Sequence, residues 1–419
     1  MISKPTTSIV IGAGQRGNAY ADFAKQHPDK LQIIGAAEPN PVMLAAIRDK
    51  YTIPQENCFD TWEQVFEREK FADTAMICTQ DRMHFEPVMA AIAKGYDILL
   101  EKPMVPTADE CKIIADAADA AGVKVIVCHV LRYSPLFKTI KRIIDNGEIG
   151  DIVSMVHNEN VGDIHASHSF VRGNWGNTAA SAPMILAKSC HDMDIMQWLI
   201  NKRCLRLNSF GGLSYFNIKN KPENAPPRCT DGCKVTDCPY DARKLYLKDI
   251  WGYGKNWFRP VATGLPNPTD EEVLTALQTG PYGRCVFQTD NDVVDHQTVN
   301  MEFEGGITAI FSMSSLTPDI SRSLKIMGTK GQIRAHSSHD SIIVDYFSTR
   351  SSREVKVVAV GGHGGGDYGI MEAFCDYVST GVAPDGISDA RISAENHLLC
   401  FAAEESRLSG GKIIEFPVT

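Results

Sequence analysis

Short apolar runs alternate with helix-compatible segments over residues 1–130. The runs have the length and β-branched content of buried parallel strands, and a period of about 3.6 marks the segments between them as helices. We predict strands at 7–11, 31–37, 74–79, 97–100 and 123–128, and helices at 18–25, 41–50, 62–66, 85–94 and 107–121. Thr107 has the N-cap pattern, with Glu110 three residues later. This alternation predicts a doubly wound parallel sheet of the Rossmann type.

The pattern changes after Arg132, where longer stretches alternate apolar and polar residues. We predict strands at 151–160, 205–216, 293–303, 307–314 and 323–327, a hairpin turn at 304–306, and helices at 135–145, 184–200 and 391–408. These elements indicate an α+β domain with a large, open, mostly antiparallel sheet. The α/β chain is thus divided into domains at 1–130 and 131–419, with an irregular Cys/Pro-rich insertion at 217–272.

The composition of the chain limits which classes of binding partner are expected. The chain has 419 residues, 43% apolar and 22% charged, with a net charge of −9, which disfavours nucleic acid or an anionic membrane as a partner. There is no signal-peptide core and no apolar run long enough to span a bilayer. We therefore expect a cytoplasmic protein whose 12 cysteines are mostly thiols.

A glycine motif ends the first strand, as Gly12-x-Gly14-x-x-Gly17 with Gln15 and Arg16 between. Such a strand–loop–helix places backbone N–H groups and a helix N-terminus against a pyrophosphate.

Glu38 ends the second strand, where dinucleotide-binding units place the acid that binds the adenosine ribose. A carboxylate there would repel a 2′-phosphate and so favours NAD over NADP. The alternative is a solvated acid at a strand end.

Further polar residues follow other strands of this sheet, at Thr79 to His84, in Glu101-Lys102-Pro103, and at His129 to Arg132. Ligands of parallel sheets bind at these carboxyl ends. Lys102 could hold a substrate hydroxyl or relay its proton, with a pKa lowered by the cofactor's positive ring. The alternative is a surface ion pair.

Lys188, His191 and Asp194 share one side of the predicted helix at 184–200. Charged neighbours around the histidine favour a tuned acid–base group over a histidine that is merely satisfied in the core.

Two further segments are candidates for substrate binding. Asp163, His165, His168 and Arg172 could be metal ligands, but their spacing fits a polar sugar-binding loop better, with Trp175 as an aromatic platform. The glycine-rich segment 361–367, with His363 and Asp367, suits a loop over a polyhydroxylated ligand; a plain linker is equally compatible.

Cys229, Cys233 and Cys238 lie within ten positions of the insertion. A structural zinc knuckle is one interpretation. No fourth ligand is evident from the sequence, so we favour loop thiols and predict no metal.

Together these motifs resemble the glucose–fructose oxidoreductase / inositol dehydrogenase (Gfo/Idh/MocA-like) family over nearly the whole chain. The marks are the glycine loop, Glu38-Pro39-Asn40, Thr79 with His84, Glu101-Lys102-Pro103, and His191 with Asp194. The resemblance implies hydride transfer between NAD(P) and a carbinol of a sugar or cyclitol. It also implies that Lys102 orients the hydroxyl and that His191 is the general base.

One position departs from the family pattern. The family usually has an aspartate four residues before the histidine, and this chain has Ala187 there, followed by Lys188. A cationic Lys188 would lower the pKa of His191 and keep it neutral. The partner that orients His191 is then left open.

From these motifs we assign NAD as the cofactor. Catalysis is assigned to Lys102, His191 and Lys188; cofactor binding to Gly12, Gly14, Gln15, Arg16, Gly17, Glu38, Thr79, His84, Glu101, Lys102 and Trp175; and substrate binding to Arg132, His165, His168, Arg172, Asp194, His363 and Asp367.

Three functions fit these residues. The first is an NAD-dependent dehydrogenase acting on a small carbohydrate-like substrate. The second is the family's NAD-retaining glycosidase branch, which the Gly-Gln-Arg-Gly loop and the segment ending in Asp367 also resemble; it works by transient C3 oxidation, elimination and re-reduction. The third is a non-catalytic sensor of NAD or sugar. We expect a homo-dimer or homo-tetramer, because an exposed sheet face commonly pairs with another subunit.

Overall fold

The N-terminal half contains a parallel sheet, as the alternation of strands and helices predicted. The computed structural model describes residues 4–339, 341–358 and 360–417. Its first sheet has six parallel strands in the order β3-β2-β1-β4-β5-β6. The strands are β1 Thr6–Ile11, β2 Leu31–Ala37, β3 Cys58–Phe59, β4 Thr74–Ile77, β5 Asp97–Leu100 and β6 Val125–Val127. The order reverses between β1 and β4, and such a reversal opens a ligand crevice at the carboxyl ends of the strands.

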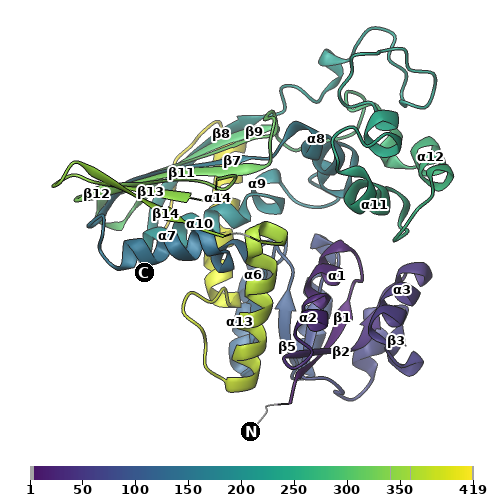
Figure 1. Cartoon of the computed structure of the whole chain (residues 1–419), viewed down its shortest axis with the longest axis horizontal. Helices are drawn as coiled ribbons and strands as arrows, with labels where there is room; N and C mark the ends of the chain where they lie inside the picture. The colour runs from purple at the N-terminus through teal and green to yellow at the C-terminus, as the bar shows by residue number, and fades with distance from the viewer. Residues whose placement is uncertain (1–3, 340, 359, 418–419) are drawn as a thin grey trace.

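Helices flank this sheet (Figure 1). They are α1 Gln15–Ala21, α2 Phe23–Gln26, α3 Pro41–Tyr51, α4 Trp62–Glu67, α5 Phe85–Ala93 and α6 Ala108–Ala121. Thr107 caps α6 as predicted, because its hydroxyl accepts a 3.3 Å hydrogen bond from the Glu110 N–H. Of the strands in this sheet, the two-residue β3 had no counterpart in the sequence prediction, since two residues carry no readable period.

The second sheet has nine strands in the order β14-β13-β12-β11-β7-β10-β9-β8-β15. Only β7 and β10, at its centre, run parallel among the paired strands of the described residues. The strands are β7 Ile152–Asn160, β8 Cys204–Gly212, β9 His296–Phe303, β10 Ile307–Ser314, β11 Ser321–Gly328, β12 Gly331–His336, β13 Ser341–Tyr346, β14 Ser351–Lys356 and β15 Ile414–Glu415. The hairpin at 304–306 joins β9 to β10, with Ile307 opposite Phe303. The predicted α/β fold, with a mostly antiparallel second sheet, is confirmed.

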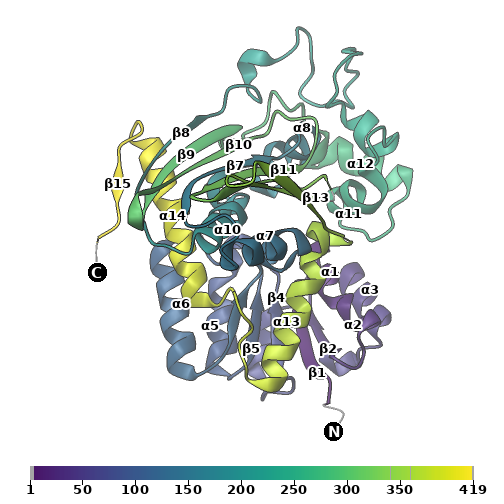
Figure 2. The same ribbon diagram turned by 60° about the vertical axis from the view of Figure 1, so that its left-hand side comes forward.

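Helices α7 Pro135–Asp145, α10 Cys190–Ile200 and α14 Ala390–Leu408 cover one face of this sheet. In both views α7 and α10 lie between the nine-stranded sheet and the Rossmann half (Figures 1 and 2). Their buried side chains, such as Ile140 and Met193, form one core with Met155 and Phe311 of the sheet. The functional side chains of α10 are thereby held near the carboxyl ends of the parallel strands.

The predicted continuous helix at 184–200 is wrong at one point. The structure divides it into α9 Met184–Ala187 and α10 Cys190–Ile200. Ser189 lies outside helical geometry at φ −89° and ψ 4°. The carbonyl of Ala187 accepts a hydrogen bond from the Lys102 ammonium at this interruption. A tertiary contact is thus made at the point where local propensity predicted an unbroken helix. Because the helix is interrupted there, Lys188 does not lie on the same helical face as His191.

Helix α13 (Gly366–Thr380) comes late in the sequence but packs on the first sheet. Its Ile370, Met371 and Phe374 share a core with Val10 and Met76 of strands β1 and β4. The segment just before α14 also pairs with β6, where the Val127 N–H donates to the Ser388 carbonyl at 2.8 Å. The end of the chain therefore returns to the N-terminal half.

The predicted irregular insertion at 217–272 lies beside α1 and α3 (Figure 1) and carries the short helix α11 Arg259–Thr263 and the start of α12 Asp270–Thr279. Among the described residues, two hydrogen bonds join it to the first domain. The Gln15 side chain donates to the Trp257 carbonyl (3.1 Å), and the Asn40 side chain donates to the Gly264 carbonyl (2.9 Å). Within the described residues, no helix is both long and apolar enough to cross a membrane.

Candidate active site

The three glycines of the loop after β1 differ in their surroundings. Gly12 has φ +88°, and a Cβ there would lie 2.7 Å from the Cys78 carbonyl oxygen. A Cβ on Gly17 would lie 2.2 Å from the Gly12 carbonyl oxygen, so α1 could not approach the loop as it does. A Cβ on Gly14 would meet nothing within 4 Å. Gly14 therefore faces the open side of the loop, which fits a cradle that a pyrophosphate approaches.

Glu38 holds the loop from the end of β2. Its carboxylate accepts hydrogen bonds from the backbone N–H groups of Ala13 (2.8 Å) and Asn40 (3.0 Å). The Asn40 side chain caps α3 by accepting from the Val42 and Met43 N–H groups. The acid thus lies where a dinucleotide ribose is bound in this fold, beside the glycine loop.

Arg16 connects the glycine loop to two acids from distant segments. Its guanidinium pairs with Glu101 (2.6 Å) after β5 and with Asp367 (2.8 Å) at the start of α13, and it donates to the Tyr20 hydroxyl (2.6 Å). Burial alone would raise the pKa values of Glu101 and Asp367, but Arg16 counteracts it for both, aided by Lys102 at Glu101 and by His363 at Asp367, and both pKa values are lowered. Both carboxylates therefore stay charged at neutral pH.

Lys102 extends from the end of β5 toward the second domain. Its ammonium donates a 2.8 Å hydrogen bond to the Ala187 carbonyl, and its backbone N–H binds the Glu101 carboxylate. The Lys102–Pro103 peptide bond is cis. Since an ammonium has three N–H donors, the bond to one carbonyl does not exhaust its capacity.

His84 ties two of these strand ends together. One ring nitrogen lies 2.9 Å from the Pro103 carbonyl and the other 3.0 Å from the Thr79 carbonyl. The Thr79 hydroxyl donates to the Met83 carbonyl (3.0 Å). His84 and Thr79 thus support the backbone around Lys102, whereas their contact with a cofactor stays a prediction.

His191, on α10, is buried and lies close to buried His129 and to His363, whose side chain is 34% exposed. Its ring centroid lies 6.0 Å from that of His129 and 5.8 Å from that of His363. Burial lowers the pKa of His191 well below its ordinary value, and the charge of Lys102 and the nearby His363 add to this. Among the described residues its Nδ1 finds no hydrogen-bond partner. Buried polar atoms are normally paired, so an unpaired ring nitrogen on His191 points to a ligand that completes the site.

His363 joins the group from the glycine-rich segment. Its Nδ1 lies 2.9 Å from the Asp367 carboxylate. Burial lowers the pKa of His363, and Asp367 opposes that effect. The predicted pair His363 and Asp367 is therefore brought to Arg16 and His191, which the sequence spacing could not show.

Lys188 points to a buried acid. Its ammonium lies 3.2 Å from a Glu159 oxygen, whose other oxygen lies 2.6 Å from Arg322. Burial lowers the pKa of Lys188, and Glu159 opposes this. Lys188 also contributes to the lowered pKa values of His363 and His165, which places it close to the histidine group.

Asp194 and Arg132 are engaged with each other. Arg132 donates to both Asp194 oxygens at 2.7 Å, and the Asn396 side chain adds a 2.6 Å bond. The Asp194 side chain is completely buried. This pair holds α10 against the segment after β6, and its predicted contact with substrate stays a prediction.

The predicted sugar-binding loop is packed against the insertion. His168 is stacked on Phe258 (centroids 3.9 Å apart), and its Nδ1 lies 2.6 Å from the Tyr246 hydroxyl. Arg172 donates to the carbonyls of Arg284 (2.7 Å) and Tyr240 (2.6 Å). The side chains of His168 and Arg172 are thus both engaged in packing and hydrogen bonding, and their contact with substrate stays a prediction.

His165 and Trp175 lie nearer the two domains' junction. The His165 ring is 4.8 Å from Trp257, the residue that Gln15 touches, and Lys188 contributes to its lowered pKa after burial. Trp175 donates its ring N–H to the Asp81 carboxylate (3.1 Å) after β4. Both remain candidates for ligand contact.

Four residues near the site had no assignment from the sequence. His129 is buried with neither ring nitrogen bonded among the described residues, and His397 accepts from the Met104 N–H at 2.9 Å. Glu159 and Arg322 form the buried ion pair beside Lys188. The sequence already placed His129 at the end of a predicted strand, directly after β6, but gave it no role. The other three come from segments whose placement only the tertiary fold decides.

Comparison with known proteins agrees with this geometry. Residues 7–129 match the family model described as "Oxidoreductase family, NAD-binding Rossmann fold", and residues 141–381 match the model of the same family's C-terminal alpha/beta domain. The chain belongs to this Gfo/Idh/MocA oxidoreductase family, as its motifs indicated, and its N-terminal domain is the NAD-binding domain.

Individual relatives are distant. The chain is 24% identical to "Putative oxidoreductase YteT" of Bacillus subtilis (strain 168) over 394 residues, 87% of each chain. Its fold is similar to that of an inositol dehydrogenase homologue from Azotobacter vinelandii in complex with NAD+ (TM-score 0.71, 14% identity, 99% and 98% of the chains covered). It is also similar to levoglucosan dehydrogenase in complex with NADH and levoglucosan (TM-score 0.72, 19% identity, 99% and 100% covered).

Proposed function

We propose that this protein is an NAD-dependent dehydrogenase that moves a hydride between the nicotinamide and a carbinol carbon of a sugar, sugar derivative or cyclitol. The observation that carries the proposal is the convergence of Lys102 and buried His191, whose Nδ1 has no hydrogen-bond partner among the described residues, beside the NAD-binding loop. The inositol and levoglucosan proteins of similar fold, both solved with nicotinamide cofactor, are consistent with a polyol substrate.

The residues around the glycine loop would hold the cofactor. The N–H groups of the loop at Gly14 face the pyrophosphate position, and Glu38 faces the ribose position. Bound NAD supplies the hydride acceptor at its nicotinamide ring. The positive charge of Arg16 is neutralised by Glu101 and Asp367, so Arg16 does not need a cofactor phosphate as its counter-charge.

Lys102 and His191 would handle the substrate hydroxyl. The Lys102 ammonium donates a hydrogen bond to the hydroxyl oxygen and stabilises negative charge that develops there. His191 is neutral at physiological pH because its pKa is depressed, so a ring nitrogen can accept the hydroxyl proton as the hydride departs. Lys188 and Glu159 are proposed to support this proton transfer electrostatically, since Lys188 faces Glu159 rather than His191.

The first experiment is a substrate screen with purified protein. Cyclitols, aldoses, anhydrosugars and sugar acids are each incubated with NAD, and reduced nicotinamide is followed by its absorbance. We expect stoichiometric reduction with at least one of these polyols. Cleavage of an aryl glycoside with no net NADH would instead support the NAD-retaining glycosidase, and NAD binding with no turnover on either class would support the sensor.

Two variants test the assignment of the residues. Lys102→Met and His191→Asn should each lower kcat by about 100-fold or more, because a positioned acid–base group contributes that much. Lys112→Met and His339→Asn make the same two substitutions at an exposed lysine and an exposed histidine, and they serve as controls. Turnover within about threefold of wild type in both site variants would contradict the assignment.

We also propose that the chain forms a homo-oligomer through the outer face of the nine-stranded sheet. Phe210 and Ile310 on this sheet are exposed, although both are apolar. Apolar patches on a sheet face commonly mark an interface. Light scattering coupled to size exclusion tests this, and a monomer at micromolar concentration would contradict it.

A further inference from the structure

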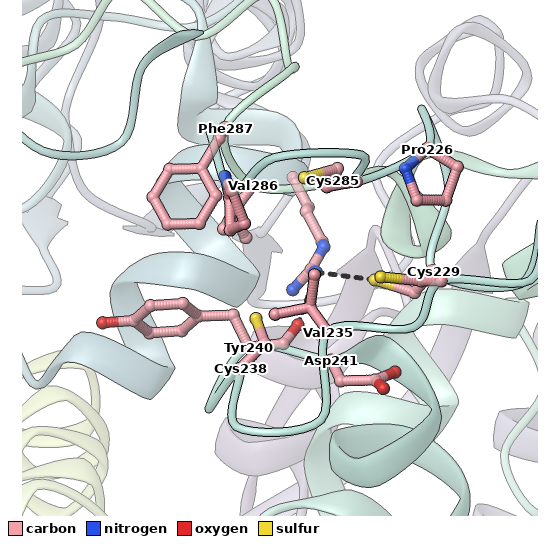
Figure 3. A pocket seen from close by; sticks show the side chains of 13 residues that line it. Pro226, Cys229, Val235, Cys238, Tyr240, Asp241, Cys285, Val286 and Phe287 are labelled. Atoms are coloured by element: carbon pink, nitrogen blue, oxygen red, sulfur yellow. Dashed lines mark hydrogen bonds between the residues drawn. The ribbon is translucent and has the colours of Figure 1, made fainter. Parts of the chain in front are cut away.

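Four cysteines line one hollow at the base of the insertion. Cys229, Cys233, Cys238 and Cys285 all contribute to its wall. Figure 3 shows the sulfur atoms of Cys229, Cys238 and Cys285 around the same space. The sequence identifies the first three as a group; the fold supplies the fourth from a distant segment.

The backbone explains why Cys229 and Cys285 share this wall. Arg228 and Arg284 form an antiparallel bridge, flanked by hydrogen bonds from the Cys229 N–H to the Gly283 carbonyl (2.9 Å) and from the Cys285 N–H to the Pro227 carbonyl (2.8 Å). Side chains alternate across such a pair, so positions 229 and 285 project to the same side. The two thiols are therefore presented together by paired backbone.

The other two cysteines lie in a turn that is held by its carbonyl groups. The Arg243 guanidinium donates to the Cys233 carbonyl (3.0 Å), and the Lys244 ammonium lies 3.4 Å from the Cys238 carbonyl. The main-chain carbonyls of both residues are thereby engaged, and both residues line the hollow.

A buried cation in the same wall provides an independent observation. Arg172 is 1% exposed and lines the hollow. Its Nη2 lies 3.7 Å from the Cys229 sulfur, whereas its Nη1 has no hydrogen-bond partner among the described residues. A buried guanidinium with an unused donor is costly unless negative charge lies near it. Asp241 also lines the hollow, but its carboxylate is paired with Arg243 at 2.7 Å. Four neutral thiols supply no negative charge, whereas four thiolates around a divalent ion carry a net charge of −2.

We propose that Cys229, Cys233, Cys238 and Cys285 bind a structural zinc ion in a tetrahedral site made of their four thiolates, with Arg172 as the neighbouring cation. All four are free thiols, and no three His, Cys, Asp or Glu side chains within the described ranges are already gathered at metal-ligand positions. Loading therefore rotates the cysteine side chains inward, to sulfur–zinc distances of about 2.3 Å, and releases their protons.

Zinc binding at this site would hold the insertion at 217–272 in one conformation. Zinc would join the turn at 229–238 to the segment at 285, and the same insertion carries Trp257 and Gly264, which contact Gln15 and Asn40. A segment with little regular structure is ordered effectively by one metal because the metal cross-links distant points of the chain.

The test begins with the wild-type full-length protein. It is purified under reducing conditions, incubated with zinc chloride, freed of excess metal and analysed for metal content. We expect about one zinc per chain, and X-ray absorption with four sulfur neighbours at about 2.3 Å. Cobalt(II) loading should give the strong visible bands of a tetrahedral thiolate site. These measurements need no variant and are independent of whether variants fold.

Variants then identify the ligands. Cys285→Ser should lower zinc content by about tenfold and should lower the thermal midpoint, whereas Cys58→Ser, at a cysteine outside the hollow, should retain full zinc. Arg172→Gln should raise the zinc dissociation constant while leaving four sulfur neighbours. The proposal is overturned by protein that stays metal-free after loading, by iron with acid-labile sulfide, by a disulfide among the four cysteines, or by full zinc in Cys285→Ser.

Discussion

The ammonium of Lys102 donates a 2.8 Å hydrogen bond to the main-chain carbonyl of Ala187, across the junction between the two halves of the molecule. Position 187 is where the family pattern has an aspartate. A carbonyl orients the ammonium without neutralising it, so the Lys102 charge still acts on His191, where it adds to burial in lowering the pKa. The carbonyl dipole of Ala187 thus holds Lys102 in place, and the charge of Lys102 helps to keep His191 neutral.

Replacing Ala187 by Asp tests this relationship. A carboxylate beside Lys102 would offset its charge, so the pKa of His191 should rise. Because the base must be neutral to accept a proton, the acidic limb of kcat/KM should move to higher pH, by ~1 unit, compared with the uncharged Ala187→Asn. The pH–rate profiles of both variants measure this, and coincident limbs would contradict the electrostatic role of Lys102.

The glycine loop gives a matched pair of variants. Gly17→Ala forces a Cβ to 2.2 Å from the Gly12 carbonyl oxygen, so it should destabilise the ligand-free protein by about 1–3 kcal/mol. Gly14→Ala meets nothing within 4 Å and should change the unfolding free energy by less than about 0.5 kcal/mol. Gly14→Ala should nevertheless weaken NAD binding, because its methyl occupies the pyrophosphate approach. Denaturant unfolding measures the loss of stability, and NAD titration measures the loss of cofactor affinity. Equal destabilisation by Gly17→Ala and Gly14→Ala would contradict this prediction.

Glu38 predicts cofactor preference. NADP should bind markedly more weakly than NAD, because the carboxylate would face the 2′-phosphate. Glu38→Gln retains the shape and an oxygen for the Ala13 N–H but removes the charge, so the ratio of the two dissociation constants should narrow. Equal affinities for NAD and NADP in the wild type would remove this argument.

The buried histidines predict a loss of stability in acid. Burial lowers the pKa values of His168 and His397 to about 3. Below a pH of about 6.5 the unfolded chain binds protons that these folded imidazoles do not, so stability is full above that pH and falls as the pH drops toward 3.

Each such histidine contributes about 1.4 kcal/mol per pH unit in this window. Denaturant unfolding at pH 7, 6 and 5 measures the slope, and His397→Gln should make it shallower by one proton. An unfolding free energy that does not change between pH 7 and pH 5 would show that these histidines are not buried in the neutral form.

The sequence by itself determined the local features of this protein. The glycine spacing after β1 specifies a strand, a tight turn and a helix, and Glu38 and Lys102 follow predicted strands whose ends meet at one edge of a parallel sheet. These inferences succeed because side-chain period and backbone sterics act over a few neighbouring residues. The site roles of Glu38, Lys102 and His191 remain predictions for the experiments above.

Only the tertiary structure decided which distant segments meet. Packing of α13 on the first sheet brings Asp367 to Arg16, and a backbone bridge brings Cys285 beside Cys229. The same packing places His168 against Phe258 and breaks the predicted helix next to Lys188. Such pairings depend on how whole elements bury their apolar faces together, and no local period in the chain encodes the partner across the core.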